Sequence, residues 1–216
     1  MEAFPQNIVL SGVSMIGSVE MPHGVITHND PDELLVGAFH NPALSKEDED
    51  AAARHFIDLY KAGGKTECNF VPDVPFSRWR KLIYNACLNS TCAITGLDTE
   101  RLRIAKTPIE NLVKPAMEEI RLAANASGVQ LPDDVAAKML SILEPIEIYF
   151  CPSMLVDVQK GNLTEFENIV GEPLREGTKN GVDMPTLRTM YGLLQAMQWK
   201  TMERKGLVNV PPCNVP

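Results

Sequence analysis

The pattern of hydrophobic and polar positions changes near residue 73. Before this point, short runs of aliphatic and β-branched residues alternate with turn signals, as is typical of strands. One helix interrupts them: Ser45 begins it, Phe56, Leu59 and Tyr60 lie on one side of it, and a Gly-Gly pair ends it. This order favours the trailing edge of an α/β sheet. We expect the strands at about 7–15, 24–27, 33–39 and 66–71.

After Pro72 the apolar residues recur with a helical period. Proline near the start and glycine just past the end delimit the predicted elements. We therefore expect a mainly α protein with a small N-terminal α/β portion at 1–72, a helical domain at 73–206 and a disordered, proline-rich tail at 207–216. The predicted helices span about 75–95, 108–127, 132–143, 153–160, 164–179 and 185–205.

Composition narrows the class of protein. The 216 residues are 44% hydrophobic and 22% charged, which suffices for a globular core. Their net charge of −8 argues against a nucleic-acid partner, because such proteins present a clustered basic face. No apolar run approaches the ~18 residues that a membrane helix needs. Since the first residues also lack the features of a signal peptide, we expect no membrane association and a cytoplasmic location.

Neither a metal site nor a nucleotide loop of the common kinds is encoded. The five cysteines form no C-x-x-C pair and the four histidines no H-E-x-x-H motif, so we expect no metal and mostly buried, reduced thiols. No two glycines are separated by a single residue, so G-x-G-x-x-G does not occur. The usual cradle for a dinucleotide pyrophosphate is therefore missing, and the residues that would bind a cofactor are unknown.

A first group of candidate residues lies on the helix predicted at 75–95. Lys81, Asn85 and Asn89 are four residues apart, which aligns them on one helical face over about 12 Å. Asparagine is a mediocre helix former, so two in one helix call for an explanation. A lysine can donate a proton to a carbonyl oxygen, and asparagine amides can bind a polar ligand without adding charge. The alternative is a solvated polar stripe.

A second group comprises Ser153 and Glu165, near the starts of two predicted helices. A hydroxyl and a carboxylate so placed could bind the hydroxyl groups of a small polar substrate. The helix termini explain the pattern equally well. Thr164 and Glu167 have the spacing of a capping box, Ser153 suits an N-cap, and Glu165 suits the positive end of a helix.

Together these stretches resemble the ketopantoate reductases, or 2-dehydropantoate 2-reductases. The resemblance covers about residues 6–205 and is densest in W-R-K-L-x-x-N-x-x-x-N at 79–89 and in S-M-L-x-D at 153–157, followed by T-E at 164–165. A weaker match is Gly171, then G-V-x-x-P at 181–185. The resemblance implies a helical domain like the C-terminal domain of 6-phosphogluconate dehydrogenase, preceded by part of a Rossmann sheet.

The resemblance also implies a reaction: NADPH-dependent reduction of 2-dehydropantoate to (R)-pantoate, in the synthesis of pantothenate and coenzyme A. Lys81 would be the general acid. Asn85 and Asn89 would orient the substrate and the lysine, and Ser153 and Glu165 would bind the substrate's carboxylate or hydroxyl end. A further family asparagine falls near Thr99, which puts one substrate contact in doubt.

The largest departure from the family is at the front. The resemblance implies a Rossmann domain before Met1 that carries the NADPH-binding glycines, so we expect a truncated chain whose activity on its own is doubtful. Two alternatives remain open. One is a non-catalytic helical module for binding or for homodimerisation, and the other is a related reductase of another 2-keto acid.

Overall fold

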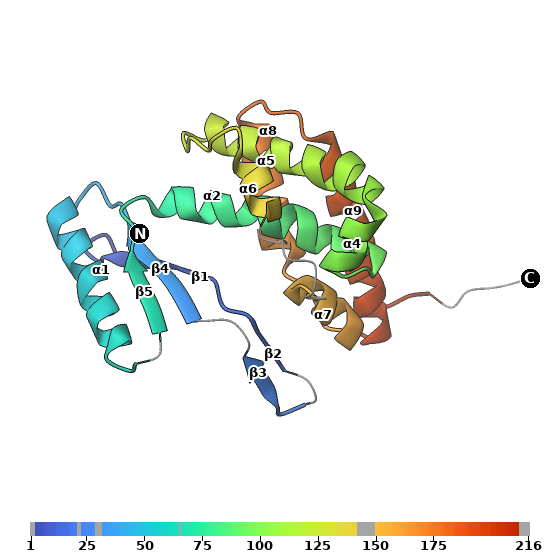
Figure 1. Ribbon diagram of the computed structural model, residues 1–216, viewed down its shortest axis with the longest axis horizontal. Helices are drawn as coiled ribbons and strands as arrows, with labels where there is room; N and C mark the ends of the chain where they lie inside the picture. The colour runs from blue at the N-terminus through green and yellow to red at the C-terminus, as the bar shows by residue number, and fades with distance from the viewer. Residues whose placement is uncertain (1–2, 21–22, 29–31, 65, 142–149, 212–216) are drawn as a thin grey trace, which may run out of the picture. The chain divides into compact units, whose positions relative to one another are not determined.

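The computed structural model of the chain describes residues 3–20, 23–28, 32–64, 66–141 and 150–211. The chain divides into two compact units, Met1–Arg78 and Trp79–Pro216, and Figure 1 labels most of their helices and strands. The boundary lies within helix α2, Val74–Tyr84. Each unit is described by itself.

The N-terminal unit contains a three-stranded sheet in the order β1-β4-β5. Strands β1 and β4 pair antiparallel, and β4 and β5 pair parallel. Helix α1 connects β4 to β5 and packs against these two strands. A small hairpin joins β2 to β3. The bounds are β1 (Val9–Ser14), β2 (Ser18–Glu20), β3 (Ile26–His28), β4 (Asp32–Phe39), α1 (Lys46–Lys61) and β5 (Thr66–Phe70). A helix between parallel strands confirms the predicted α/β character of this unit.

Helix α1 begins as its sequence predicts, but it buries a different face. The hydroxyl of Ser45 accepts a hydrogen bond from the Asp48 amide at 3.1 Å, which caps the helix. Ala53 and Ile57 form its core side, with Tyr60 packed beside them. Of the three residues expected on one side of the helix, Phe56 is 39% exposed and Leu59 is 62% exposed. The buried face of α1 is thus the one that carries Ala53 and Ile57, which pack with Val36 and Cys68 of the sheet.

The second unit is helical, and the predicted fold class is confirmed. Helix ends fall at the expected glycines: Gly96, Gly161 and Gly206 each follow a helix in the left-handed conformation that an L side chain rarely adopts. The elements after α2 are η1 (Asn85–Asn89), α3 (Ser90–Thr95), α4 (Thr99–Ala105), η2 (Ile109–Val113), α5 (Lys114–Ala126), α6 (Val135–Ser141), α7 (Ser153–Lys160), η3 (Glu167–Gly171), α8 (Glu172–Lys179) and α9 (Pro185–Arg204).

Three differences from the expected helices stand out. The segments η1, η2 and η3 are π-helical, so the helices predicted at 75–95, 108–127 and 164–179 each contain a wider turn. Thr99, expected in a loop, is the first residue of α4. The helix predicted from residue 132 begins at Val135, and its expected last residues, like the end of the tail, lie outside the described residues.

Helix α5 forms the centre of the helical unit, with Met117 and Ile120 fully buried, and it packs against η1, α8 and α9. Its Glu119 carboxylate accepts hydrogen bonds from the backbone amides of Thr186 at 2.9 Å and Leu187 at 2.8 Å, which caps the start of α9. Helix α7 packs against α3 and η1, and η3 also packs against η1. Segment η1 therefore contacts the elements that follow both Ser153 and Glu165.

Within the described part of the chain, no helix is long and apolar enough to cross a membrane, and no group of three or more His, Cys, Asp or Glu side chains could hold a metal ion. Cys68, Cys87 and Cys92 are free and buried, as expected, whereas Cys151 is exposed. Cys213 lies outside the described residues.

Candidate active site

Lys81 lies in the last turn of α2, and Asn85 and Asn89 are the first and last residues of η1. The side-chain amide of Asn89 donates a hydrogen bond to Oδ1 of Asn85 at 3.2 Å, so the two amides lie on the same side of the helix. Lys81 and Asn85 are both half-buried. Single π-helical turns within α-helices are frequent at functional sites, because the wider turn displaces side chains from the regular α-helical pattern.

Asn89 is the most distinctive polar residue of this segment. It is 5% exposed, and its Oδ1 is the buried side-chain oxygen or nitrogen without a hydrogen-bond partner among the residues that the structure describes. A buried acceptor left unpaired costs about 1–3 kcal/mol. Such exceptions are rare in folded proteins. The oxygen therefore has an unused capacity to accept a hydrogen bond, and a ligand could use it only if the surrounding side chains give it access.

The three central residues of η1 are apolar and fully buried: Ala86, Cys87 and Leu88. Burial raises the pKa of the Tyr84 hydroxyl and of the Cys87 thiol, and it raises the pKa of Cys92 to about 12. Asparagine amides can contact a polar ligand without adding charge, and a hydrogen bond made in a buried position is stronger than one made in water.

Ser153 is the first residue of α7, and its side chain is exposed. The prediction that it caps this helix is wrong: Pro152, in an extended conformation, occupies the N-cap position without a side-chain hydrogen bond. The proline carbonyl accepts the first helical bond, from the Val156 amide at 3.0 Å. The next residue, Met154, is buried and accepts a hydrogen bond from Ser90 at 3.7 Å, which fastens the start of α7 to α3.

Glu165 lies two residues before η3, and its side chain is exposed. The capping box predicted for Thr164 and Glu167 is not formed. Instead, the amide and hydroxyl of Thr164 both donate to Oε1 of Gln198, at 3.0 and 3.3 Å. The backbone carbonyl of Glu165 accepts the first bonds of the helix, from the amides of Asn168 and Ile169. A capping role thus explains neither Ser153 nor the predicted box.

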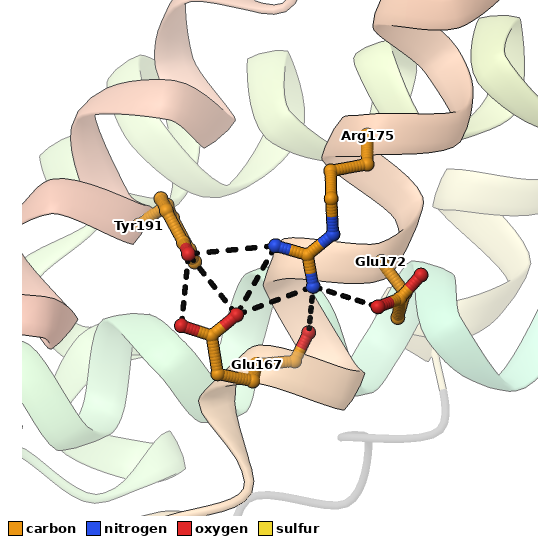
Figure 2. Close-up of polar contacts among 4 residues, drawn as sticks. All are labelled: Glu167, Glu172, Arg175 and Tyr191. Carbon is orange, nitrogen blue, oxygen red and sulfur yellow. Dashed lines mark hydrogen bonds and ion pairs between the residues drawn. The ribbon is translucent and has the colours of Figure 1, made fainter.

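Glu167 belongs to a separate polar cluster, which we call the η3 cluster: Glu167, Glu172, Arg175 and Tyr191 (Figure 2). Its carboxylate accepts hydrogen bonds from the Tyr191 hydroxyl at 2.8 Å and from Arg175 at 3.1 Å. Hydrogen bonds to Glu172 and then Glu167 raise the pKa of the Arg175 guanidinium. The three charged groups and the tyrosine hydroxyl thus each have a hydrogen-bond partner within the cluster, without a ligand.

The structure joins two of the five predicted site residues directly, Asn85 and Asn89. Ser153 begins α7 and Glu165 precedes η3, two elements that pack against η1, but neither side chain is hydrogen-bonded to Asn85 or Asn89 among the described residues. Thr99 makes a structural contact: its backbone amide and its hydroxyl both donate hydrogen bonds to the carbonyl oxygen of Phe150. Sequence reasoning missed this link and the π-helical turn, although the two asparagines within one helix were a signal of irregular geometry.

The described residues do not fit the pyrophosphate of a dinucleotide cofactor. Such a group is held where a glycine-rich turn leads into a helix. The glycines with positive φ in the described chain instead follow helices or lie in turns, and none begins a helix.

Residues 73–198 match the family described as "Ketopantoate reductase PanE/ApbA C terminal". The chain belongs to the ketopantoate reductase family. The matched residues include Lys81, the η1 segment, α7 and Glu165, so the candidate site lies entirely within the family's C-terminal region.

Curated relatives extend this similarity over almost the whole chain. An uncharacterised protein of Saccharomyces cerevisiae is 38% identical over 209 residues, which are 93% of this chain and 56% of the yeast protein. A 2-dehydropantoate 2-reductase of Nostoc is 27% identical over 97% of this chain and 64% of its own length. The chain thus spans less than two thirds of the length of these relatives.

Solved structures agree. The crystal structure of 2-dehydropantoate 2-reductase from Methylococcus capsulatus matches 93% of this chain and 61% of its own, with a TM-score of 0.77 and 28% identity. A D-mandelate dehydrogenase in complex with NADH and anilino(oxo)acetate matches 89% of this chain and 75% of its own, with a TM-score of 0.76 and 22% identity. The fold is therefore shared by proteins named for different substrates, so the fold does not decide the substrate.

Proposed function

We propose that this chain carries the substrate side of an NADPH-dependent reductase that converts 2-dehydropantoate to (R)-pantoate. Membership of the ketopantoate reductase family and the similarity to two proteins named 2-dehydropantoate 2-reductase support the proposal. The described residues lack a pyrophosphate cradle, so the proposal assigns this chain the binding of the keto acid and the proton transfer, and no cofactor contact.

The observation that carries the proposal is the unpaired, buried oxygen of Asn89 beside the amide of Asn85. A hydroxyl group of the substrate would donate to Asn89 Oδ1 and satisfy it. Since an unpaired acceptor already costs free energy in the empty site, a hydroxyl that pairs with it gains more than the same hydroxyl at an exposed acceptor. Asn85 would orient the substrate and Lys81 through the same side of the helix.

Lys81 is the proposed general acid. A nicotinamide, if bound by a cofactor domain, would supply the hydride for the ketone carbon, and the carbonyl oxygen would then need a proton. The Lys81 ammonium, one helical turn before Asn85, donates that proton to the oxygen. A cation placed there also stabilises the developing charge before the transfer, and the apolar, buried residues of η1 strengthen this interaction.

Ser153 and Glu165 are proposed to bind the other end of the substrate. An ionised Glu165 can only accept hydrogen bonds and repels the carboxylate. Because Asn89 takes the proton of the substrate's one hydroxyl group, Glu165 would bind the substrate through a bridging water molecule. Ser153 can donate, so it suits the carboxylate. Both side chains are exposed, Ser153 at the start of α7 and Glu165 two residues before η3, and α7 and η3 both pack against η1.

The test is a fusion in which the cofactor domain of the Methylococcus capsulatus relative precedes this chain. A panel of 2-keto acids is offered with NADPH and with NADH, and initial rates are measured. We expect the highest kcat/KM for 2-dehydropantoate with NADPH. Preference for another 2-keto acid would identify a reductase of a different substrate, and a folded fusion that reduces no 2-keto acid would refute the proposal.

The chain alone supplies a second comparison. Titration with NADPH up to millimolar concentration should give no saturable binding, because the described residues form no pyrophosphate cradle. Sedimentation velocity of the same sample tests the competing reading of a non-catalytic dimerisation module. A stable dimer of the chain, together with an inactive fusion, would favour that module over the reductase.

A further inference from the structure

Thr99 makes two hydrogen bonds to one backbone oxygen that lies far away in the sequence. It is 2% exposed and is the first residue of α4. Its backbone amide donates to the carbonyl oxygen of Phe150 at 3.2 Å, and its hydroxyl donates to the same oxygen at 3.1 Å. Phe150 lies three residues before Ser153. These two hydrogen bonds fix the position of the Phe150 carbonyl, immediately before α7.

Little freedom remains between this fixed point and Ser153. Only Cys151 and Pro152 intervene. The pyrrolidine ring holds φ of Pro152, which is −62° here, and a residue before proline is restricted to extended conformations. The Pro152 carbonyl then accepts the first helical bond of α7, from the Val156 amide at 3.0 Å. A displacement at Phe150 is therefore passed on to Ser153, because few soft torsions could absorb it.

Helix α4, which begins with Thr99, is fixed by its N-terminal cap and by buried side chains. Asp98, only 4% exposed, caps α4 by accepting a hydrogen bond from the Arg101 amide at 2.8 Å. Glu100 and Leu102 on the same helix are 4% and 0% exposed, and α4 packs against η2. Thr99 therefore acts as a fixed anchor, and the segment at 150–153 is the part that it restrains.

We propose that Thr99 is a positioning residue that sets the place of the Ser153 hydroxyl for substrate binding. The inference rests on the proposed function for its chemical purpose, since Ser153 matters only if it contacts the substrate. It also gives a physical meaning to the departure from the family at Thr99. A threonine here contributes through the Phe150 carbonyl and the start of α7, so no contact of its own with the substrate is needed.

The test compares Thr99→Val, which keeps the shape and removes the hydroxyl, with Thr99→Ser, which keeps the hydroxyl. The matched control is Thr189→Val, because the exposed Thr189 also donates to a carbonyl, that of Pro185 within its own helix. Amide hydrogen exchange of the full 216-residue chain is the first readout. We expect exchange of the α7 amides to rise roughly two- to tenfold in Thr99→Val and to stay at the parent rate in Thr99→Ser and Thr189→Val.

Local and global effects separate in this experiment. Unchanged exchange in α7 of Thr99→Val would overturn the anchor, and an equal rise in α5 and α9 would show a general loss of stability instead of positioning. If Thr99→Val does not fold, Pro152→Gly replaces it, because glycine frees the torsions between the anchored carbonyl and Ser153. We expect the same selective loosening of α7, and unchanged exchange there would contradict the inference.

The second readout is kinetic and uses the fusion with the cofactor domain. We expect Thr99→Val to raise KM for 2-dehydropantoate several-fold with kcat nearly unchanged, and Thr99→Ser to restore KM. A looser α7 with an unchanged KM would refute positioning for binding. An inactive parent fusion would refute the proposed function, and the exchange result would still decide whether Thr99 anchors this segment.

Discussion

The π-helical segments η1 and η3 pack against each other, yet their polar side chains are in opposite situations. In η3, the Glu167 carboxylate is half-exposed and bonded to Arg175 and Tyr191. In η1, Asn89 is buried, and its Oδ1 has no partner among the described residues. A π-helical turn thus occurs both in η3, where the polar side chain has its hydrogen-bond partners, and in η1, where a buried acceptor lacks one among the described residues.

Gly171 shows that η3 is built around its own contacts. A Cβ atom at this position would lie 2.9 Å from both Arg175 Nη2 and Glu167 Oε2 and 3.0 Å from the Tyr191 ring, so the absence of a side chain lets the η3 cluster lie flat over the helix. A half-exposed ion pair adds little stability. The difference teaches that a π-helical turn alone does not mark a site. A buried group without a partner is the better guide.

The largest expected effect is at Lys81, one turn before η1. In the fusion with the cofactor domain, Lys81→Ala should lower kcat by about 10²–10⁴-fold with a smaller change in KM, because proton donation is required mainly in the transition state. Steady-state kinetics measures both constants. The control is Lys179→Ala, an exposed lysine of α8 beside the η3 cluster, which should leave kcat unchanged. Equal kcat in the Lys81 variant and the parent would remove the lysine from the mechanism.

Asn89→Leu should give a smaller effect, and one that separates binding from stability. The change removes an unpaired buried acceptor, so the free energy of unfolding should change by less than about 1 kcal/mol. Binding of 2-dehydropantoate, measured as KM in the fusion, should weaken about tenfold or more.

Glu119→Gln is the control for that variant, because this buried carboxylate has two backbone partners at the start of α9. Loss of one acceptor should lower the free energy of unfolding by about 1–3 kcal/mol without a change in KM. If urea denaturation instead shows that Asn89→Leu is the more destabilised of the two, then Asn89 is a structural residue.

The smallest effect is expected at Glu167→Gln. This change weakens the ion pair with Arg175 but keeps an acceptor for the Tyr191 hydroxyl. Since exposed ion pairs contribute little, Tm should fall by no more than about 3 °C, and KM should not change. Differential scanning calorimetry and kinetics check both. A several-fold rise in KM would show that η3 takes part in substrate binding and would contradict the proposal that η1, and not η3, supplies the binding groups.

The parts of the structure that are local in the chain could be predicted from the sequence. Prolines and glycines delimit the helices as expected, because Pro185 and Gly206 act through their own backbone torsions. The alignment of Asn85 with Asn89 also follows from spacing alone.

Contacts between distant residues could not be predicted in this way. Thr164 bonds to Gln198 and not to the helix that follows it, and Thr99 bonds to Phe150 across 51 positions. In both cases tertiary packing offers a partner that local patterns cannot contain. The roles of Lys81, Ser153 and Glu165 remain predictions that the kinetic variants decide.

The central claim is that the keto acid binds at η1. The most direct test is NMR of the uniformly ¹⁵N-labelled 216-residue chain during titration with 2-dehydropantoate, with the side-chain amide signals assigned. We expect the signals of Asn85 and Asn89 to shift and saturate, while those of Asn125 and Asn180, whose side chains bond to Leu131 and Ser127, stay in place. Shifts confined to these two control residues, or signals of Asn85 and Asn89 that do not move at saturating substrate, would contradict binding at η1.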